Sequence, residues 1–64
     1  MNPRKIAIER LEAAGFQLKR NGSNHDIYCN PGVRGIIPLK RHDFNENDLK
    51  YITKEINVLL KSGK

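Results

Sequence analysis

The sequence of 64 residues holds a single cysteine, and its apolar runs are only two or three residues long. Because Cys29 has no second cysteine to pair with, an intramolecular disulfide and a four-cysteine zinc site are both excluded. The apolar runs fall far short of the roughly 20 residues that a membrane-spanning helix needs. Residues 1–5 lead into no long apolar segment, so we expect no signal peptide. A free thiol suits a reducing compartment, and we therefore expect a cytoplasmic protein.

Acidic residues are fewer than basic ones: 7 Asp and Glu stand against 12 Lys and Arg, which gives a formal net charge of +5. This excess on a short chain is typical of nucleic-acid-binding domains, although solubility alone also accounts for such charge. The basic groups are Lys19 with Arg20, Arg34, and Lys40 with Arg41. If the strands beside them are neighbours, these groups converge near one side of a sheet, which favours nucleic-acid binding.

The chain has room for a single domain, residues 1–64, and contains neither an internal repeat nor a low-complexity tract. A first helix is predicted over residues 3–14, with Asn2 as its N-cap and Pro3 at its first position. Gly15 follows as a helix stop. A second helix is indicated near the other end by apolar residues at helical spacing. Its apolar positions are Leu49, Ile52, Ile56, Leu59 and Leu60, and its start is capped by Asn45 or Asn47.

The strands expected between the helices cover residues 16–20, 25–30 and 33–39. Asn21 and Gly22 predict a hairpin between the first two, because both residues tolerate a positive φ. Pro31 and Gly32 predict a type II turn, and Pro38 marks the third strand as an edge or its exit. The expected fold is therefore α+β, in the order α-β-β-β-α. Its three-stranded antiparallel sheet has two helices packed on one face and leaves the other face open.

The alternation of side chains along a strand predicts which of them face the helices. The residues expected to do so are Phe16, Leu18, Ile27 and Cys29. That choice sends Asp26 and Tyr28 to the open face. His25 shares the parity of Ile27, but it holds the first position of its strand, where the core thins out. We therefore expect His25 at the rim of the sheet, half covered and reachable.

The segment Gly-Ser-Asn-His at residues 22–25 leads from the hairpin turn directly into the second strand. The segments around it are Gly15-Phe16, residues 19–21, Pro31-Gly32, Ile36-Ile37-Pro38, and the helix with Leu49, Ile52 and Ile56. In order and spacing, over nearly the whole chain, they resemble the HicA family of bacterial toxins and its glycine–Ser/Thr–x–His motif. Many members carry a second histidine two residues after the third-strand proline. This chain has Lys40 there, with His42 two positions further along.

The resemblance implies a small RNase with a fold like that of double-stranded-RNA-binding domains. Its activity is expected to be that of an mRNA interferase, which cleaves RNA independently of the ribosome with one histidine. By position, that histidine is His25. The resemblance also implies a protein partner, an antitoxin of the HicB family that covers the active site of the toxin.

Histidine suits RNA cleavage because its unperturbed pKa of about 6.5 permits proton transfer near neutrality. One histidine fills one role at a time, so another group or water must serve the 2′-OH or the leaving 5′-oxygen. Basic side chains stabilise the developing oxyanion, the backbone around Gly22 and Ser23 offers an anion-binding nest, and Tyr28 offers a stacking surface for single-stranded RNA. The expected substrate-binding residues are Lys19, Arg20, Gly22, Ser23, Asn24, Tyr28, Lys40 and Arg41.

Simpler readings stand beside these assignments. A histidine next to a turn is commonly solvated or capping, and Ser23 is more often a turn former than a nucleophile. The two His-Asp pairs, at residues 25–26 and 42–43, match no metal motif, and neighbouring strand residues point to opposite faces, so we expect no metal and no cofactor. The alternative function is a non-catalytic RNA-binding module, in which His25 only hydrogen-bonds a 2′-OH. DNA binding is less favoured, because no helix carries a basic recognition face.

Overall fold

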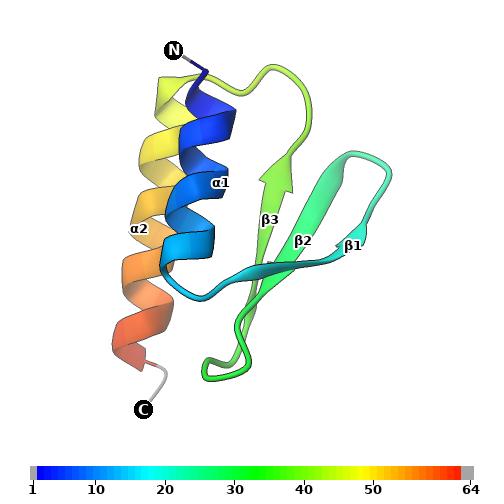
Figure 1. The fold of residues 1–64 in the computed structure, drawn as a ribbon. Helices are drawn as coiled ribbons and strands as arrows, with labels where there is room; N and C mark the ends of the chain where they lie inside the picture. Colours follow the sequence, from blue (N-terminus) through cyan, green and yellow to red (C-terminus); the bar gives the residue numbers. More distant parts are fainter. Residues whose placement is uncertain (1, 63–64) are drawn as a thin grey trace.

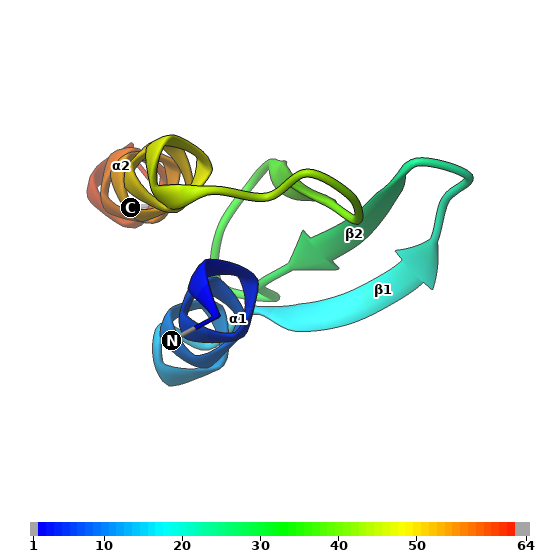
Figure 2. The same ribbon diagram turned by 90° about the horizontal axis from the view of Figure 1, so that it is seen from above.

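The computed structural model describes residues 2–62, in which two helices and three strands follow one another as α-β-β-β-α (Figure 1). The elements are α1 (Pro3–Ala13), β1 (Gln17–Asn21), β2 (His25–Cys29), β3 (Ile36–Lys40) and α2 (Glu46–Ser62). The strands form one antiparallel sheet in the order β1-β2-β3, and the two helices lie side by side (Figure 2). The predicted α+β class is therefore confirmed. Over the described range, no helix is both long and apolar enough to cross a membrane.

Helix α1 begins and ends where the sequence predicts. The Asn2 side chain accepts hydrogen bonds from two N–H groups of the first turn, at 3.0 and 3.3 Å, and Pro3 needs no such partner. At the other end Gly15 has a φ of 91°, and the Phe16 N–H donates to the Leu11 carbonyl at 2.8 Å. This Schellman arrangement returns Phe16 to the core beside Leu11, where both side chains are fully buried.

Helix α2 begins with a reciprocal cap. Asn45 Oδ1 accepts hydrogen bonds from the N–H groups of Asn47 and Asp48, at 2.9 and 3.2 Å. Asp48 Oδ2 in turn accepts one from the Asn45 N–H at 3.0 Å. Of the two predicted N-caps, Asn45 is therefore the one observed. Its reciprocal hydrogen bonds with Asp48 satisfy N–H groups that the first turn would otherwise leave unpaired.

The hairpin between β1 and β2 has a different loop from the predicted one. Strand β1 ends at Asn21 and β2 begins at His25, so the loop consists of residues 22–24. Gly22 does not have a positive φ. A glycine is needed there because a Cβ would lie 2.6 Å from the His25 carbonyl oxygen, which accepts a hydrogen bond from the Gly22 N–H at 2.8 Å.

The turn between β2 and β3 also differs in type. The Val33 N–H donates to the Asn30 carbonyl at 3.0 Å, so the chain reverses at the predicted place. The type II prediction was wrong, because such a turn requires a positive φ at Gly32 and the structure has none there. Asn30 Oδ1 instead accepts a hydrogen bond from the Gly32 N–H at 2.8 Å, and the positive φ, 103°, falls on Gly35. Strand β3 consequently begins at Ile36.

The two faces of β2 are the reverse of those predicted. Tyr28 is 6% exposed and Asp26 9%, whereas His25 is exposed and Ile27 and Cys29 are only half-buried, on the other face. The prediction placed the acid outside, but two arginines hold the Asp26 carboxylate on the helix side. The core consists of Ala7, Leu11, Phe16, Tyr28, Ile37, Leu39, Ile52 and Ile56.

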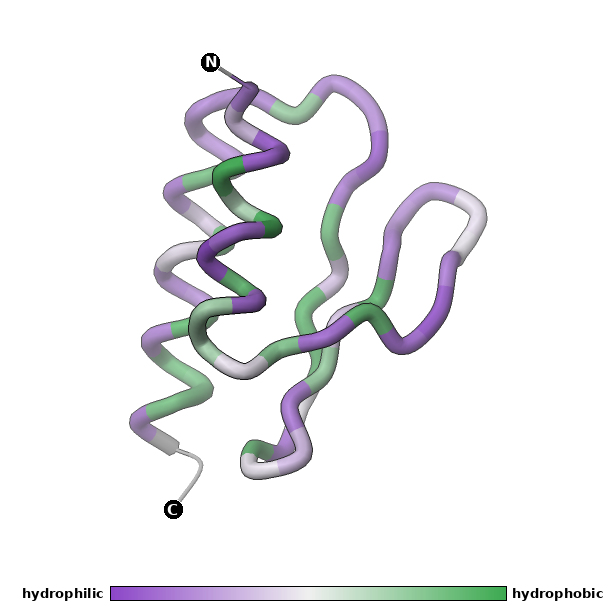
Figure 3. The backbone as a smooth tube through the Cα atoms, viewed as in Figure 1, coloured by the Kyte–Doolittle hydropathy of each residue, from purple (hydrophilic) through white to green (hydrophobic). Residues whose placement is uncertain are grey.

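Strand β1 lies beyond the cover of the helices, and every one of its residues is exposed. Figures 1 and 2 show the β1–β2 hairpin projecting away from α1 and α2, and Figure 3 shows hydrophilic residues at its tip. Leu18 lies opposite the buried Tyr28, on the face that was predicted for it, but it is 50% exposed because β1 projects beyond the helices. The register shifts between Leu18 and Arg20, so a bulge breaks the simple alternation beyond Leu18.

Candidate functional site

At one end of the sheet, which we call the His25 end, β1 finishes, β2 begins and β3 finishes (Figure 1). His25 lies directly opposite Lys40 in the register, so both side chains lie on the same face of the sheet, opposite to that of Asp26. The Lys40 carbonyl accepts a hydrogen bond from Arg4 Nε at 2.9 Å, outside the sheet ladder. The Arg41 N–H donates to the Asn24 carbonyl at 3.2 Å, so the next pair is hydrogen-bonded. Because the two kinds of pair alternate, the His25–Lys40 pair is of the non-hydrogen-bonded kind, in which opposite Cα atoms are about 4.5 Å apart and side chains approach most closely.

A buried carboxylate organises the other face of the His25 end. Arg4 Nη2 donates to Asp26 Oδ2 at 2.6 Å, and Arg41 Nε donates to Asp26 Oδ1 at 2.8 Å. Because Arg4 also binds the Lys40 carbonyl, these contacts connect the first turn of α1, the start of β2 and the end of β3. Sequence reasoning missed this cluster, since Arg4 and Asp26 are 22 positions apart and neither belongs to a motif.

The two arginines keep Asp26 ionised. The hydrogen bond from Arg41 is the largest cause that lowers the pKa of Asp26; burial opposes it, while the Arg41 charge and Arg4 add to the lowering. A carboxylate that accepts charged hydrogen bonds on both oxygens fixes its donors in place. Arg41, which we predicted to contact substrate, is thus engaged within the protein by one of its guanidinium nitrogens.

A cleft of about 160 Å³ opens beside His25. We call it the His25 cleft; its sheet side is formed by His25, Pro38 and Lys40 and its helix side by Phe44, Asp48, Tyr51 and Ile52. Lys40 Nζ lies 3.5 Å from Asp48 Oδ2, so an ion pair spans the cleft between the sheet and α2. The hydrogen bond from the Asn45 N–H is the main cause that lowers the pKa of Asp48, with the Lys40 charge adding to it and burial opposing it.

The accessible aromatic residue near His25 is on α2, not on β2. Tyr28, which we predicted as a stacking surface, lies in the core, where burial raises the pKa of its hydroxyl and its ring is covered. Tyr51 is 55% exposed and lines the His25 cleft. The sequence did indicate that Tyr51 is exposed, because it lies outside the apolar stripe of α2 to which the buried Ile52 and Ile56 belong.

The loop of residues 22–24 is fixed by backbone hydrogen bonds on both sides. The Gly22 N–H donates to the His25 carbonyl, and the Arg41 N–H donates to the Asn24 carbonyl at 3.2 Å. The Gly22 N–H is therefore not available to an anion, which removes one donor from the predicted nest. The side chains of Ser23 and Asn24 are exposed beside His25.

Four of the five predicted cations gather at the His25 end. Lys19 and Arg20 are exposed on β1, and Arg20 pairs with Ile27, two residues from His25. Lys40 and Arg41 reach the same end from β3. Arg34 does not join them, because it lies in the loop between β2 and β3, at the opposite end of the sheet (Figure 1).

The structure does not bring the two His-Asp pairs of the sequence together into one site. His42 is exposed in the segment after β3, and Asp43 follows it with a φ of 56°. His25 and Asp26 lie on opposite faces of β2, as the alternation of a strand requires. Among residues 2–62, no three His, Cys, Asp or Glu side chains come close enough together to hold a metal ion.

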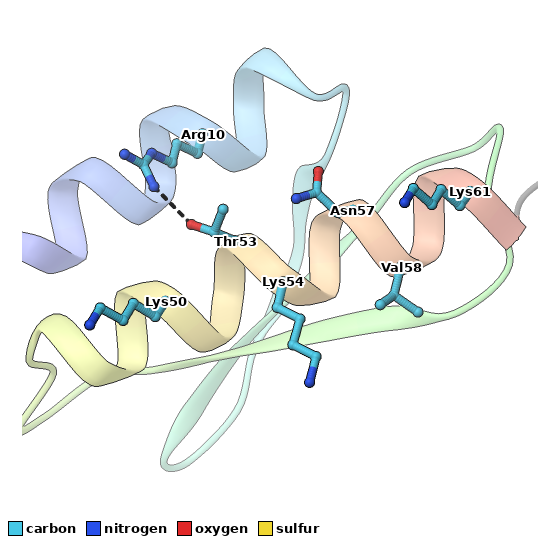
Figure 4. Close-up of a pocket in the computed structure, with 7 residues that line it drawn as sticks. All are labelled: Arg10, Lys50, Thr53, Lys54, Asn57, Val58 and Lys61. Atoms are coloured by element: carbon cyan, nitrogen blue, oxygen red, sulfur yellow. Dashed lines mark hydrogen bonds between the residues drawn. The ribbon is translucent and has the colours of Figure 1, made fainter.

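A larger hollow, of about 460 Å³, runs along the outer side of α1 and α2 and does not include His25 (Figure 4). We call it the helix groove; its lining residues are Arg10, Lys50, Thr53, Lys54, Asn57, Val58 and Lys61. Arg10 Nη1 donates to Thr53 Oγ1 at 2.9 Å across the groove. The ion pairs in the described part of the chain involve Asp26 and Asp48, and none includes a lysine of the groove.

The arrangement defines a small basic α+β domain with a histidine at the end of an antiparallel sheet. The model of one family, the HicA toxin of bacterial toxin-antitoxin, matches residues 4–61, nearly the whole chain. The protein therefore belongs to the HicA toxin family, as the sequence resemblance predicted, and an antitoxin partner is implied. No curated protein and no solved structure matches the chain.

Proposed function

We propose that this protein is an endoribonuclease, the toxin of a type II toxin–antitoxin system, and that His25 is its catalytic residue. The observation that supports this proposal is the position of His25, which is exposed at the start of β2, opposite Lys40 and at the mouth of a cleft. A general base needs access to its substrate, and the developing oxyanion needs positive charge beside it. The position of His25 next to Lys40 supplies both.

In the proposed reaction, the His25 imidazole takes the proton of a ribose 2′-OH. The 2′-oxygen then attacks the adjacent phosphorus, the bond to the 5′-oxygen breaks, and a 2′,3′-cyclic phosphate forms. Water or a second group gives the leaving 5′-oxygen its proton. Lys40 stabilises the developing oxyanion, while Lys19 and Arg20 hold the phosphates that follow along β1.

The proposed substrate is single-stranded mRNA in the cytoplasm, bound on the open face at the His25 end. Ser23 and Asn24 border this surface, and their exposed side chains are suited to hydrogen bonds with phosphate or ribose. We further propose that a HicB-type antitoxin covers the His25 cleft. A complex with the antitoxin that cleaved RNA as fast as the free toxin would contradict that part of the proposal.

The direct test is digestion of an unstructured RNA by the purified wild type, His25→Ala and His42→Ala. We expect the wild type to leave 2′,3′-cyclic phosphate ends, and His25→Ala to be slower by at least about 100-fold. His42→Ala is the matched control, because it removes the other exposed histidine and should cleave at nearly the wild-type rate. Addition of a chelator should leave the rate unchanged. Equal cleavage by wild type and His25→Ala would refute the role of His25.

The second candidate is a non-catalytic RNA-binding module. The same basic end supports it, since binding and cleavage require the same electrostatics. It predicts that the wild type binds single-stranded RNA but leaves it intact. It also predicts that the protein arrests growth equally well with His25→Ala, whereas a catalytic toxin loses this effect with the substitution.

A further inference from the structure

We propose that the His25 cleft holds one nucleobase of the bound RNA, stacked on the ring of Tyr51. This inference rests on the proposed function, because it assigns a base to the site at which the backbone would be cut. It assigns a binding role to Tyr51, Phe44 and Asp48, which sequence reasoning did not connect with substrate.

The walls of the cleft suit a flat aromatic ring. Tyr51 is a large aromatic that is 55% exposed, and Pro38 faces the cleft from the exposed side of β3. Ile52, 2% exposed, belongs to the core and closes the floor, with Phe44 half-buried beside it. Unpaired bases bind proteins by stacking on such rings, at roughly 1–3 kcal/mol for each base.

The rim of the cleft carries groups that can hydrogen-bond the edge of a base. Lys40 supplies N–H donors, and Asp48 supplies acceptors. Asp48 Oδ2 is already occupied by the Asn45 N–H and by Lys40, but within the described residues Oδ1 accepts no hydrogen bond. A donor and an acceptor side by side match the Watson–Crick edge of an RNA base, which places an N–H next to an oxygen or a ring nitrogen.

The size and place of the cleft also favour a single base. Its volume of about 160 Å³ is below the roughly 300–1,000 Å³ of pockets that enclose larger ligands. Because Lys40 belongs both to the rim and to the pair with His25, a base in the cleft would bring its own ribose or the adjoining phosphate close to the imidazole. The cleft would thereby set which phosphodiester is cut.

The test uses the fluorescence of 2-aminopurine, which falls when the base stacks on an aromatic ring. The probe is a short oligonucleotide of 2′-fluoro nucleotides, which lack the attacking hydroxyl, with 2-aminopurine at each position in turn. We expect quenching by the wild type and by Tyr51→Phe at one position, and its loss with Tyr51→Ala. Tyr51→Ala should also raise KM for cleavage of ordinary RNA roughly tenfold.

Leu60→Ala is the matched control, because it removes another exposed apolar side chain of α2 outside the cleft, and it should behave as the wild type. Circular dichroism would verify that each variant is folded. If the wild type cleaves RNA but Tyr51→Ala keeps both the quenching and the KM, the base site is wrong and the nuclease stands. If the wild type quenches the probe but cleaves no RNA, the base site stands and the nuclease is wrong.

Discussion

Three cations at the His25 end contact carboxylates, whereas the lysines of the helix groove contact none within residues 2–62. The paired ones are Arg4 and Arg41, which share Asp26, and Lys40, which contacts Asp48. The unpaired ones are Lys50, Lys54 and Lys61 on the outer side of α2. A cation that donates to a partly buried carboxylate is held in one place, while a solvated lysine moves freely. We infer that the first group sets geometry near His25 and the second only raises the local potential that attracts an anion.

The largest effect is expected from Asp26→Asn, which should release Arg4 and Arg41 from their positions. The substitution keeps the shape of the side chain but leaves two arginines without their shared charge, so the free energy of unfolding should fall by roughly 2 kcal/mol. Denaturation by urea measures it, and RNA cleavage should slow because Arg41 and the end of β3 are released. The control is Asp43→Asn, an exposed acid at a positive φ that asparagine tolerates. If the two variants were equally stable, the ion pairs of Asp26 would not stabilise the His25 end.

Low pH should remove the stabilisation by the Asp26 carboxylate from the wild type. The pKa of Asp26 is lowered in the folded protein, so its stabilising effect is complete above the unfolded-state pKa. That effect is lost as the pH falls through the lower folded-state pKa. The difference in unfolding free energy between wild type and Asp26→Asn should therefore shrink between about pH 5 and pH 2. A difference that stays constant over this range would show that Asp26 does not act through its charge.

The smallest effect on the fold is expected from the helix groove. Replacing Lys50, Lys54 and Lys61 by glutamine should change the free energy of unfolding by no more than about 0.5 kcal/mol. It should weaken binding of a 2′-fluoro RNA and lower the salt dependence of the association constant by roughly 2 in the logarithmic slope, provided that all three lysines contact phosphates. Lys5→Gln, on the exposed side of α1, removes one charge outside the groove and is the control for Lys54→Gln alone, which removes one charge within it. An unchanged slope would show that the groove does not meet RNA.

The order of the elements could be predicted because each signal is local. Asn2 and Gly15 delimit α1 through bonds to residues a few positions away, and the apolar repeat of α2 needs only its own spacing. The placement of His25 at the start of β2 was predictable for the same reason, whereas the prediction that it is half covered was wrong, because it is exposed. The placement depends on where the hairpin turns and on nothing further along the chain.

The faces of β2 could not be predicted in this way. Alternation offers two parities, and the usual preference for burying residues such as Ile27 and Cys29 selected the wrong one. Asp26 is tolerated on the helix side only because Arg4 and Arg41 come from distant segments to neutralise it. Tyr51 was overlooked for a similar reason. The pattern of α2 indicates that Tyr51 is exposed, but its position beside His25 arises only when α2 lies against β3.

Pro38 has a consequence for how the sheet can grow. It occupies the middle of β3, one of the two edge strands, and lies opposite Ile27 in the same kind of pair as His25 and Lys40. The missing N–H therefore faces outward, so another strand docking along β3 would lack its central bond. A further strand can therefore pair more readily with the other edge, β1. There the charges of Lys19 and Arg20 repel a second copy of this basic chain and attract an acidic strand. Growth of a fibre, which needs both edges, is therefore disfavoured.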